Sequence, residues 1–247
     1  VVHRKHASIH RVAKMLPNAM GFLMGKEINA ITSAMNNPDR PFVAILGGAK
    51  VSDKIAVIKN LLPKADTILI GGAMAFTFLK AEGYDVGTSI IDEEKLEIAK
   101  NTLDEAKALG KTILLPVDVV CTEVYSPSAR GTVYPVDKIP EDMMGLDIGP
   151  ETIKLFSKVI KEAHTVIWNG PVGVFEFDSF ADGTKKIAKA LTKVNGTTIV
   201  GGGDTAAAIH EFGYEDYITH ISTGGGASLK LLEGADLPGL DVLDDKE

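Results

Sequence analysis

Glycines, lysines and one aspartate follow the apolar runs of this sequence in an order that suits binding of a phosphorylated ligand. Five apolar runs lead into glycine, and each precedes a segment with helical spacing: Phe42 to Gly48, Thr67 to Gly72, Thr165 to Pro171, Thr197 to Asp204 and Thr219 to Gly226. Glycine lets the backbone approach a ligand closely, and a following helix offers free N–H groups to an anion. Five such ends in one chain predict a surface built for a phosphorylated ligand.

Two lysines follow the first glycine pair, in the segment GGAKVSDK. Their spacing of four residues predicts that Lys50 and Lys54 lie on one face of a helix, near its positive end. Two cations in that place would bind an oligophosphate. The alternative is a pair of solvated surface lysines, and the position directly after Gly47 and Gly48 favours the phosphate site.

Two acids stand at other strand ends. Asp204 follows three glycines at a predicted helix start, where its carboxylate suits either a Mg²⁺ that holds phosphate oxygens or an ordinary N-cap. Glu176 lies just past a strand end, where a buried carboxylate would suit ribose hydroxyls and an exposed one would be a simple loop acid. The segment Ser222 to Ser228 repeats the glycine pattern without an acid, and its backbone N–H groups suit a phosphate.

Several other chemistries have little support. A P-loop has four residues between its first glycine and Gly-Lys, but only three separate Gly21 from Gly25-Lys26, so this segment is not a P-loop. No G-x-G-x-x-G motif occurs, which argues against a dinucleotide-dependent oxidoreductase. The net charge of −7 argues against a general nucleic-acid surface. The single cysteine, Cys121, excludes an internal disulfide and fits a reducing compartment. Trp168 and Phe175 are predicted to be core residues rather than base-stacking ones.

The basic segment at residues 1–16 contains three histidines interleaved with arginine and lysine. That charge would oppose a metal ion, so His3, His6 and His10 predict an anion-binding strand or a plain surface segment rather than a metal site. No apolar run approaches the roughly 20 residues that cross a bilayer, and no signal peptide is evident. We therefore expect a cytoplasmic protein, and the missing initiator methionine suggests a piece of a longer chain.

The elements that must position these residues alternate between strand and helix. Predicted helices cover residues 17–37, 52–62, 73–82, 92–109, 150–163, 179–194, 204–212 and 226–233. The run Thr112 to Val120 reads as a sixth, buried strand, residues 121–140 as a β-hairpin flap, and MMGLDIGP as a loop. The pattern predicts a doubly wound α/β fold: a mostly parallel six-stranded sheet with helices on both faces, plus a small β-hairpin flap. Ligands bind such sheets outside the carboxyl ends of the strands.

Seven segments carry a resemblance to a known family. They occur in the order GGAKVSDK, LIGGAMAFTFLKA, LPVDVV, MGLDIGP, WNGPVGVFE, GGGDTAAA and STGGGASLKLLEG. With them the chain resembles phosphoglycerate kinase, and within that family the C-terminal, nucleotide-binding half. The match runs from about His3 to the end of the chain.

The resemblance implies a role for each of a set of residues. Lys50 would lie near the transferred phosphoryl group, Lys54 near the α-phosphate, and Asp204 would face a nucleotide-bound Mg²⁺. Other phosphate contacts would come from Asn169, Gly202, Gly203, Thr205, Gly224, Gly225 and Gly226, of which Gly225 and Gly226 are assigned to catalysis. The adenosine slot would be formed by Gly71, Gly72, Gly145, Leu146 and Val174, with Tyr125 a weaker candidate. Glu176 would bind the ribose hydroxyls.

The resemblance also implies a division of the chain and a set of partners. Residues 1–16 would be the remnant of a substrate domain, 17–37 the interdomain helix and 38–247 the nucleotide-binding domain. His3 and Arg4 would bind the glycerate substrate, but nearly all of the domain that supplies their partners is absent. We expect Mg²⁺ with ATP or ADP as cofactor, 3-phosphoglycerate or 1,3-bisphosphoglycerate only with the missing domain, no nucleic acid or membrane partner, and a monomer.

The expected function is therefore that of half an enzyme. The whole kinase would move a phosphoryl group between 1,3-bisphosphoglycerate and ADP in glycolysis, while this chain alone would bind Mg-nucleotide without turnover. The alternative is a non-catalytic nucleotide-binding module that uses the same domain as a sensor or scaffold.

Overall fold

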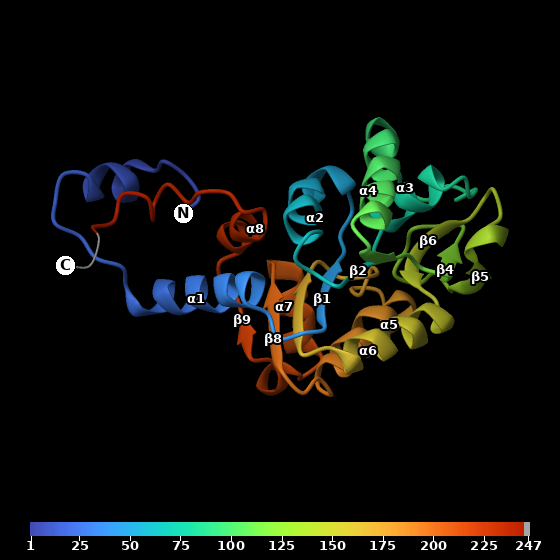
Figure 1. The fold of residues 1–247 in the computed structure, drawn as a ribbon. Coiled ribbons are helices and arrows are strands. Elements are labelled where there is room, and N and C mark those ends of the chain that lie inside the picture. The colour runs from blue at the N-terminus through green and yellow to red at the C-terminus, as the bar shows by residue number, and fades with distance from the viewer. Residues whose placement is uncertain (245–247) are drawn as a thin grey trace.

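A six-stranded sheet lies at the centre of the computed structural model, which describes residues 1–244 (Figure 1). Each neighbouring pair of its strands is parallel. In spatial order the strands are β3 (Thr112–Leu114), β2 (Thr67–Ile70), β1 (Phe42–Leu46), β7 (Thr165–Asn169), β8 (Thr197–Gly201) and β9 (His220–Ile221). The predicted doubly wound sheet is confirmed.

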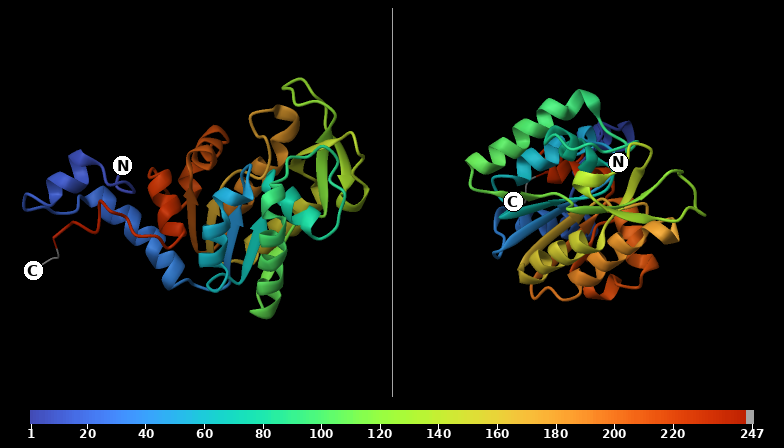
Figure 2. Two further views of the ribbon diagram at one scale, coloured as in Figure 1. Left: turned by 90° about the horizontal axis from the view of Figure 1, so that it is seen from above. Right: turned by 90° about the vertical axis from the view of Figure 1, so that its right-hand side faces the viewer.

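Helices cover both faces of this sheet, because side chains alternate across each strand and both sets are apolar. In β1, for example, Phe42, Ala44 and Leu46 belong to one core, while Val43 and Ile45 belong to the other. The first core is covered by α1 (Phe22–Asn36), α2 (Ile55–Leu61), α3 (Met74–Ala81), α4 (Leu96–Ala108) and α8 (Gly226–Leu232), and the second by α5 (Pro150–Glu162), α6 (Asp182–Leu191) and α7 (Gly203–Glu211). The two helix layers are separated by the sheet in the right-hand view of Figure 2.

A second sheet of three antiparallel strands lies beside the first, in the order β5-β4-β6. It consists of β4 (Asp118–Thr122), β5 (Thr132–Pro135) and β6 (Met144–Ile148). The prediction of a two-stranded flap was therefore incomplete, and the segment expected to be a loop, MMGLDIGP, contains β6. The expected single strand from Thr112 to Val120 is wrong: it is divided between the two sheets around Pro116, which has no N–H to donate to a ladder.

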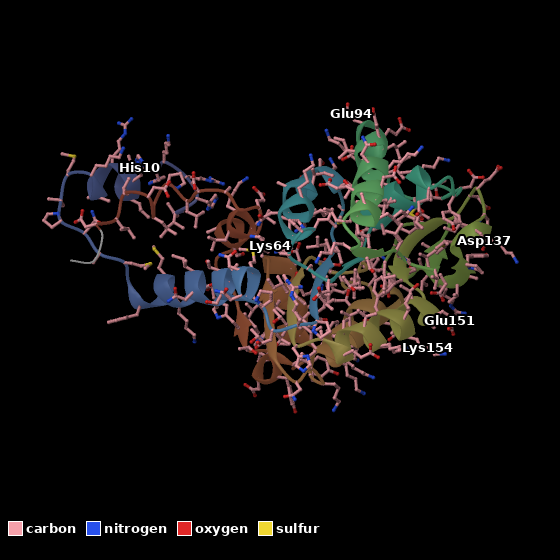
Figure 3. The ribbon with its side chains drawn as sticks, in the orientation of Figure 1. His10, Lys64, Glu94, Asp137, Glu151 and Lys154 are labelled. Carbon is pink, nitrogen blue, oxygen red and sulfur yellow. The ribbon has the colours of Figure 1, made fainter. Side chains whose placement is uncertain are left out.

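Two buried aspartates of the small sheet cap α5 and α6, two helices that cover the main sheet. Asp118 of β4 accepts hydrogen bonds from the backbone N–H groups of Glu151 (3.0 Å) and Thr152 (2.8 Å) in the first turn of α5. Asp147 of β6 accepts one from the N–H of Gly183 (2.7 Å) in the first turn of α6. Figure 3 labels Glu151 and its ion-pair partner Lys154 on α5. These bonds satisfy helix N–H groups that have no intrahelical acceptor.

The first helix starts later than its spacing predicts, at Phe22 rather than Pro17. Asn18 is held outside the helix by the C-terminal segment, since its backbone N–H donates to Asp244 Oδ2 (2.9 Å) and its side-chain amide donates to the carbonyl of Val242 (3.2 Å). In the same region the N–H of Gly239 donates to the carbonyl of Val2 (2.8 Å). The N-terminal and C-terminal segments therefore run together at one end of the molecule (Figure 1).

Three more helices begin later than predicted, because a 3₁₀ turn precedes each. These turns are Val51–Asp53 before α2, Glu93–Lys95 before α4 and Asp178–Phe180 before α6. A further 3₁₀ turn spans Val136–Lys138, another spans Glu215–Tyr217, and a π-helical turn spans Ala7–Arg11. Over residues 1–244, each helix is too short or too polar to traverse a bilayer.

Candidate functional site

The glycine segments that follow β1, β2, β7 and β8 meet at the carboxyl edge of the main sheet. Leu46 of β1 pairs with Asn169 of β7, which in turn pairs with Gly201 of β8, so the loops after these strands start side by side. The loops after β1 and β7 are in contact, because a Cβ on Gly47 would lie only 2.1 Å from the carbonyl oxygen of Pro171. The chain leaves β1 toward β2 on one side and leaves β7 toward β8 on the other, which is the arrangement that opens a ligand crevice.

Two adjoining clefts lie at this switch point. The first, the lysine cleft, has a volume of about 720 Å³, and the second, the apolar cleft, about 480 Å³. The lysine cleft is lined by the predicted site residues His3, Lys50, Lys54, Asn169, Gly202, Gly203, Asp204, Thr205 and Gly226. The apolar cleft is lined by the predicted residues Gly72, Tyr125, Gly145, Leu146, Val174, Glu176 and Asp204. Gly48, Ala49, Pro171 and Asp204 line both clefts.

The two lysines reach the lysine cleft by a different route from the one predicted. Lys50 has an extended backbone (φ −126°, ψ 137°) before a 3₁₀ turn, and Lys54 precedes the first residue of α2. They therefore do not share a helix face, and the inference from their spacing is wrong. Burial lowers the pKa of Lys54, although the negative charges of Asp53, Asp204 and Glu233 act in the opposite direction.

Asn169 offers an unused donor in the same cleft. Its side chain is buried, and its Oδ1 accepts a hydrogen bond from the Nζ of Lys54. Its Nδ2 is equally buried but has no hydrogen-bond partner. A buried polar donor without a partner is costly, so this amide marks a place where an acceptor group of a ligand would stabilise the protein.

The first turn of α7 also faces the lysine cleft. Gly202, with φ +93°, turns the chain into the helix, and no side chain caps the free N–H groups that follow. The hydroxyl of Thr205 points instead to the neighbouring loop, where it accepts a hydrogen bond from the N–H of Gly170 (2.7 Å). The carboxylate of Asp204 is exposed at the boundary between the two clefts. This corner thus combines free backbone donors with one acid.

The apolar cleft lies between the small sheet and the loop after β7. Leu146 and Val174 meet there through a backbone hydrogen bond (2.8 Å), and Gly145 is required because a Cβ would lie 2.0 Å from the ring of Phe76. Glu176 lies on the rim and is exposed, so of the two alternatives left open by the sequence, the buried carboxylate is wrong and the exposed loop acid is the one observed. Tyr125 packs against Phe177 with ring centroids 4.9 Å apart.

Four of the predicted residues line neither cleft. Gly71 is packed against Val172, and Gly224 lines a separate cavity of about 170 Å³ between α1 and α8. Gly225 forms the turn before α8 with φ +44°. Arg4 is exposed, and its Nε donates to Nε2 of His3 (3.2 Å).

Two other sequence-based expectations concern aromatic residues. Trp168 and Phe175 are buried, as predicted for core residues. The indole N–H of Trp168 donates to the carbonyl of Gly170 (2.7 Å), so this side chain supports the loop after β7 from within the core.

Sequence reasoning missed three charged residues around the site. Lys230 and Glu233 line the lysine cleft from α8 and from the residue after it, and their position just after the glycine segment was the available signal. Glu27 of α1 accepts hydrogen bonds from the N–H (2.8 Å) and hydroxyl (2.9 Å) of Thr223 and pairs with His220 (2.9 Å).

Burial disfavours the charged form of Glu27, but hydrogen bonds from His220, Thr223 and Ser222 outweigh it, and the pKa of this carboxyl is lowered. Nothing in the local sequence pairs Glu27 with residues almost two hundred positions away. The contact fastens α1 to the glycine segment before α8.

The fold and the site together define a class: a doubly wound, Rossmann-like α/β domain with a lysine-lined cleft and an apolar cleft joined at the sheet's switch point. Comparison with known proteins identifies the family. The sequence model described as phosphoglycerate kinase matches residues 1–235, and the chain belongs to the phosphoglycerate kinase family.

Individual relatives agree with this assignment. A phosphoglycerate kinase of Finegoldia magna is 54% identical over 244 residues, which cover 99% of this chain and 62% of that protein. The cytosolic phosphoglycerate kinase 3 of Arabidopsis thaliana is 52% identical over 247 residues, or 98% of this chain and 62% of that protein. The solved structure of phosphoglycerate kinase from Coxiella burnetii superposes with a TM-score of 0.94 at 40% identity, over 98% of this chain and 62% of the other. The chain thus spans less than two thirds of the length of these relatives.

Proposed function

We propose that this chain is the nucleotide-binding half of a glycolytic phosphoglycerate kinase. The whole enzyme transfers a phosphoryl group reversibly between 1,3-bisphosphoglycerate and ADP, in the cytoplasm and as a monomer. The observation that carries the proposal is the junction of the lysine cleft and the apolar cleft at Asp204. A nucleoside polyphosphate needs an apolar surface for its base and cationic donors for its phosphates, side by side.

In this proposal the apolar cleft binds adenosine. Gly72, Gly145, Leu146 and Val174 form the walls of the base-binding slot, where small residues leave room for a flat ring. Glu176 on the exposed rim accepts hydrogen bonds from the ribose hydroxyls without needing to be buried. Tyr125 lies near enough to close the outer side of the slot.

The lysine cleft binds the phosphates. Lys54 and the free Nδ2 of Asn169 donate to phosphate oxygens, together with the N–H groups at the start of α7. Thr205 contributes through its backbone N–H and through its hydroxyl, which accepts from the N–H of Gly170 and keeps its own O–H as a donor. Lys50, at the exposed side of the cleft, lies near the transferred phosphoryl group.

The residues present fit a Mg²⁺ that arrives with the nucleotide. Mg²⁺ keeps several waters and is usually bound by one or two carboxylates plus substrate phosphates. Asp204 supplies one such carboxylate, exposed at the cleft junction and not engaged in capping α7. When bound, the ion neutralises part of the phosphate charge.

Catalysis is proposed to need both halves of the enzyme. In the forward direction a β-phosphate oxygen of ADP attacks the acyl phosphate, the bond between phosphorus and the carboxyl oxygen breaks, and 3-phosphoglycerate leaves. No covalent enzyme intermediate is required, so Lys50, Gly225 and Gly226 serve by orientation and charge stabilisation.

The division of the chain follows from this scheme. Residues 38–247 form the nucleotide domain, and 17–37 contain the helix that joins it to the substrate domain. His3 and Arg4 belong with the glycerate substrate. Positioning of two reactants contributes on the order of 7–11 kcal/mol in favourable cases, so this chain alone binds nucleotide without turnover.

Calorimetric titration with Mg-ADP tests the proposal. We expect the wild-type chain to bind and Asp204→Ala to bind about tenfold more weakly, while Asp142→Ala, an exposed acid outside both clefts, binds like wild type. Absence of binding by the wild-type chain would refute the proposal. Adding a separately produced substrate domain should generate kinase activity; binding without any gain of activity would instead support a non-catalytic module.

A further inference from the structure

A third lysine lines the lysine cleft in addition to the two that the sequence pattern indicates. Lys230 lies on α8, and its Nζ forms an ion pair with the carboxylate of Glu233. Both side chains border the cleft. The carboxylate partner is nearly buried, with 11% of its side chain exposed, whereas Lys230 remains 45% exposed. The ammonium group is therefore held at the cleft but is free to move on a flexible stem.

Lys230 and His3 line the same cleft. The positive charge of Lys230 influences the titration of His3: the pKa of His3 is lowered by burial and further by the charges of the N-terminus, Arg4 and Lys230. The His3 ring is next to the glycine segment, since a Cβ on Gly226 would lie 3.1 Å from its Nε2. Neither His3 nor Lys230 lines the apolar cleft, whereas Asp204 lines both clefts. Lys230 thus lies in the part of the lysine cleft that is not shared with the apolar cleft.

The charge of Glu233 acts on Lys54 as well as on Lys230. On Lys54 this negative charge opposes the effect of burial. The charge of one carboxylate therefore acts on two ammonium groups, that of Lys54 just before α2 and that of Lys230 on α8. A phosphate group entering the cleft brings a second anion, which would compete with Glu233 for Lys230 because both form charge-assisted hydrogen bonds.

We propose that Lys230 binds the terminal phosphate of ATP, and that Glu233 holds it at the cleft until the nucleotide arrives. This assignment rests on the proposed nucleotide-binding function of the cleft. It adds a specificity-determining residue: a nucleotide with a terminal phosphate long enough to reach Lys230 contacts it, and a shorter nucleotide does not.

The test compares Lys230→Met with a matched variant by calorimetric titration of Mg-ATP and AMP. The control is Lys154→Met, which removes a lysine from another i,i+3 ion pair, with Glu151 on α5, outside both clefts (Figure 3). We expect Lys230→Met to weaken Mg-ATP binding by about threefold to tenfold, because a partly exposed charged hydrogen bond is lost. AMP affinity should stay at the wild-type value, and Lys154→Met should bind both ligands like wild type.

A second background tests the part played by Glu233. In Glu233→Gln the restraining charge is absent, so the loss of ATP affinity caused by Lys230→Met should be about twofold larger than in the wild-type background. An equal loss in both backgrounds would overturn the role of Glu233.

The outcomes separate this assignment from the proposed function. Wild-type binding of Mg-ATP with no change in Lys230→Met would overturn the assignment alone. An equal loss of ATP and AMP affinity would overturn it too, since it would indicate a structural effect. Failure of the wild-type chain to bind ATP, ADP and AMP would overturn the proposed function and the assignment together.

Discussion

Replacement of Thr205 by valine isolates one hydrogen bond that joins two loops of the site. The hydroxyl of Thr205 accepts from the N–H of Gly170 at 2.7 Å, and both residues are buried. Valine has nearly the same shape, so Thr205→Val removes the acceptor without opening a large cavity. The N–H of Gly170 then remains buried and unpaired, which costs about 1–3 kcal/mol.

Urea unfolding measures this cost. For a loss of about 2 kcal/mol and a slope of about 3 kcal/mol/M, the midpoint should fall by about 0.7 M with an unchanged slope. The matched control is Thr132→Val, an exposed threonine on β5 for which the same change should stay within about 0.5 kcal/mol. If Thr205→Val were as stable as Thr132→Val, the assignment of this bond as a structural one would be refuted.

Two further predictions concern the aspartates of the small sheet. Asp118→Ala removes the acceptor of two helix N–H groups and of the Thr152 hydroxyl (2.7 Å), so it should lower the free energy of unfolding by about 2–3 kcal/mol. The control Glu123→Ala removes an exposed acid and should change this free energy little. Equal stabilities of the two variants in urea would contradict this prediction. Burial raises the pKa of Asp147 well above its ordinary value, so the folded protein keeps a proton that the unfolded chain loses near pH 4. The free energy of unfolding should therefore fall as the pH rises above about 4 toward the folded pKa, by up to about 1.4 kcal/mol per pH unit from this group. Asp147→Asn should lack this component. If the free energy of unfolding changed with pH in the same way in the wild type and in Asp147→Asn, the prediction would be wrong.

The main sheet could be predicted because its signal is local. Each of its strands is a short apolar run with a glycine or turn after it, and parallel strands buried on both faces have few other sequence patterns. The small sheet was not predicted in full, because β6 reads MGLDI: its apolar residues alternate over only five positions, with a glycine and an aspartate, which are depleted in strands, between them. Its identity as a strand depends on pairing with β4, which the sequence does not display.

The candidate site shows the same division between local and long-range information. The glycine segments do meet at one edge of the sheet, and Lys50, Lys54 and Asp204 do line one cleft. The helical spacing of the lysines was misleading, since a 3₁₀ turn lies between them. The unpaired amide of Asn169 and the contact of Glu27 with Thr223 depend on tertiary packing, and no local pattern reports them.

The capping of two different helices by the small sheet has a mechanical consequence for the apolar cleft. A small sheet bonded to its neighbours at one point can rotate about that point, whereas a sheet bonded at two separated points resists both sliding and rotation. Asp118 and Asp147 provide two such attachments, and β6, which carries Gly145 and Leu146, is one of the attached strands. The width of the apolar cleft is thus set before any ligand enters, so binding of adenosine there, as proposed, would lose little conformational entropy.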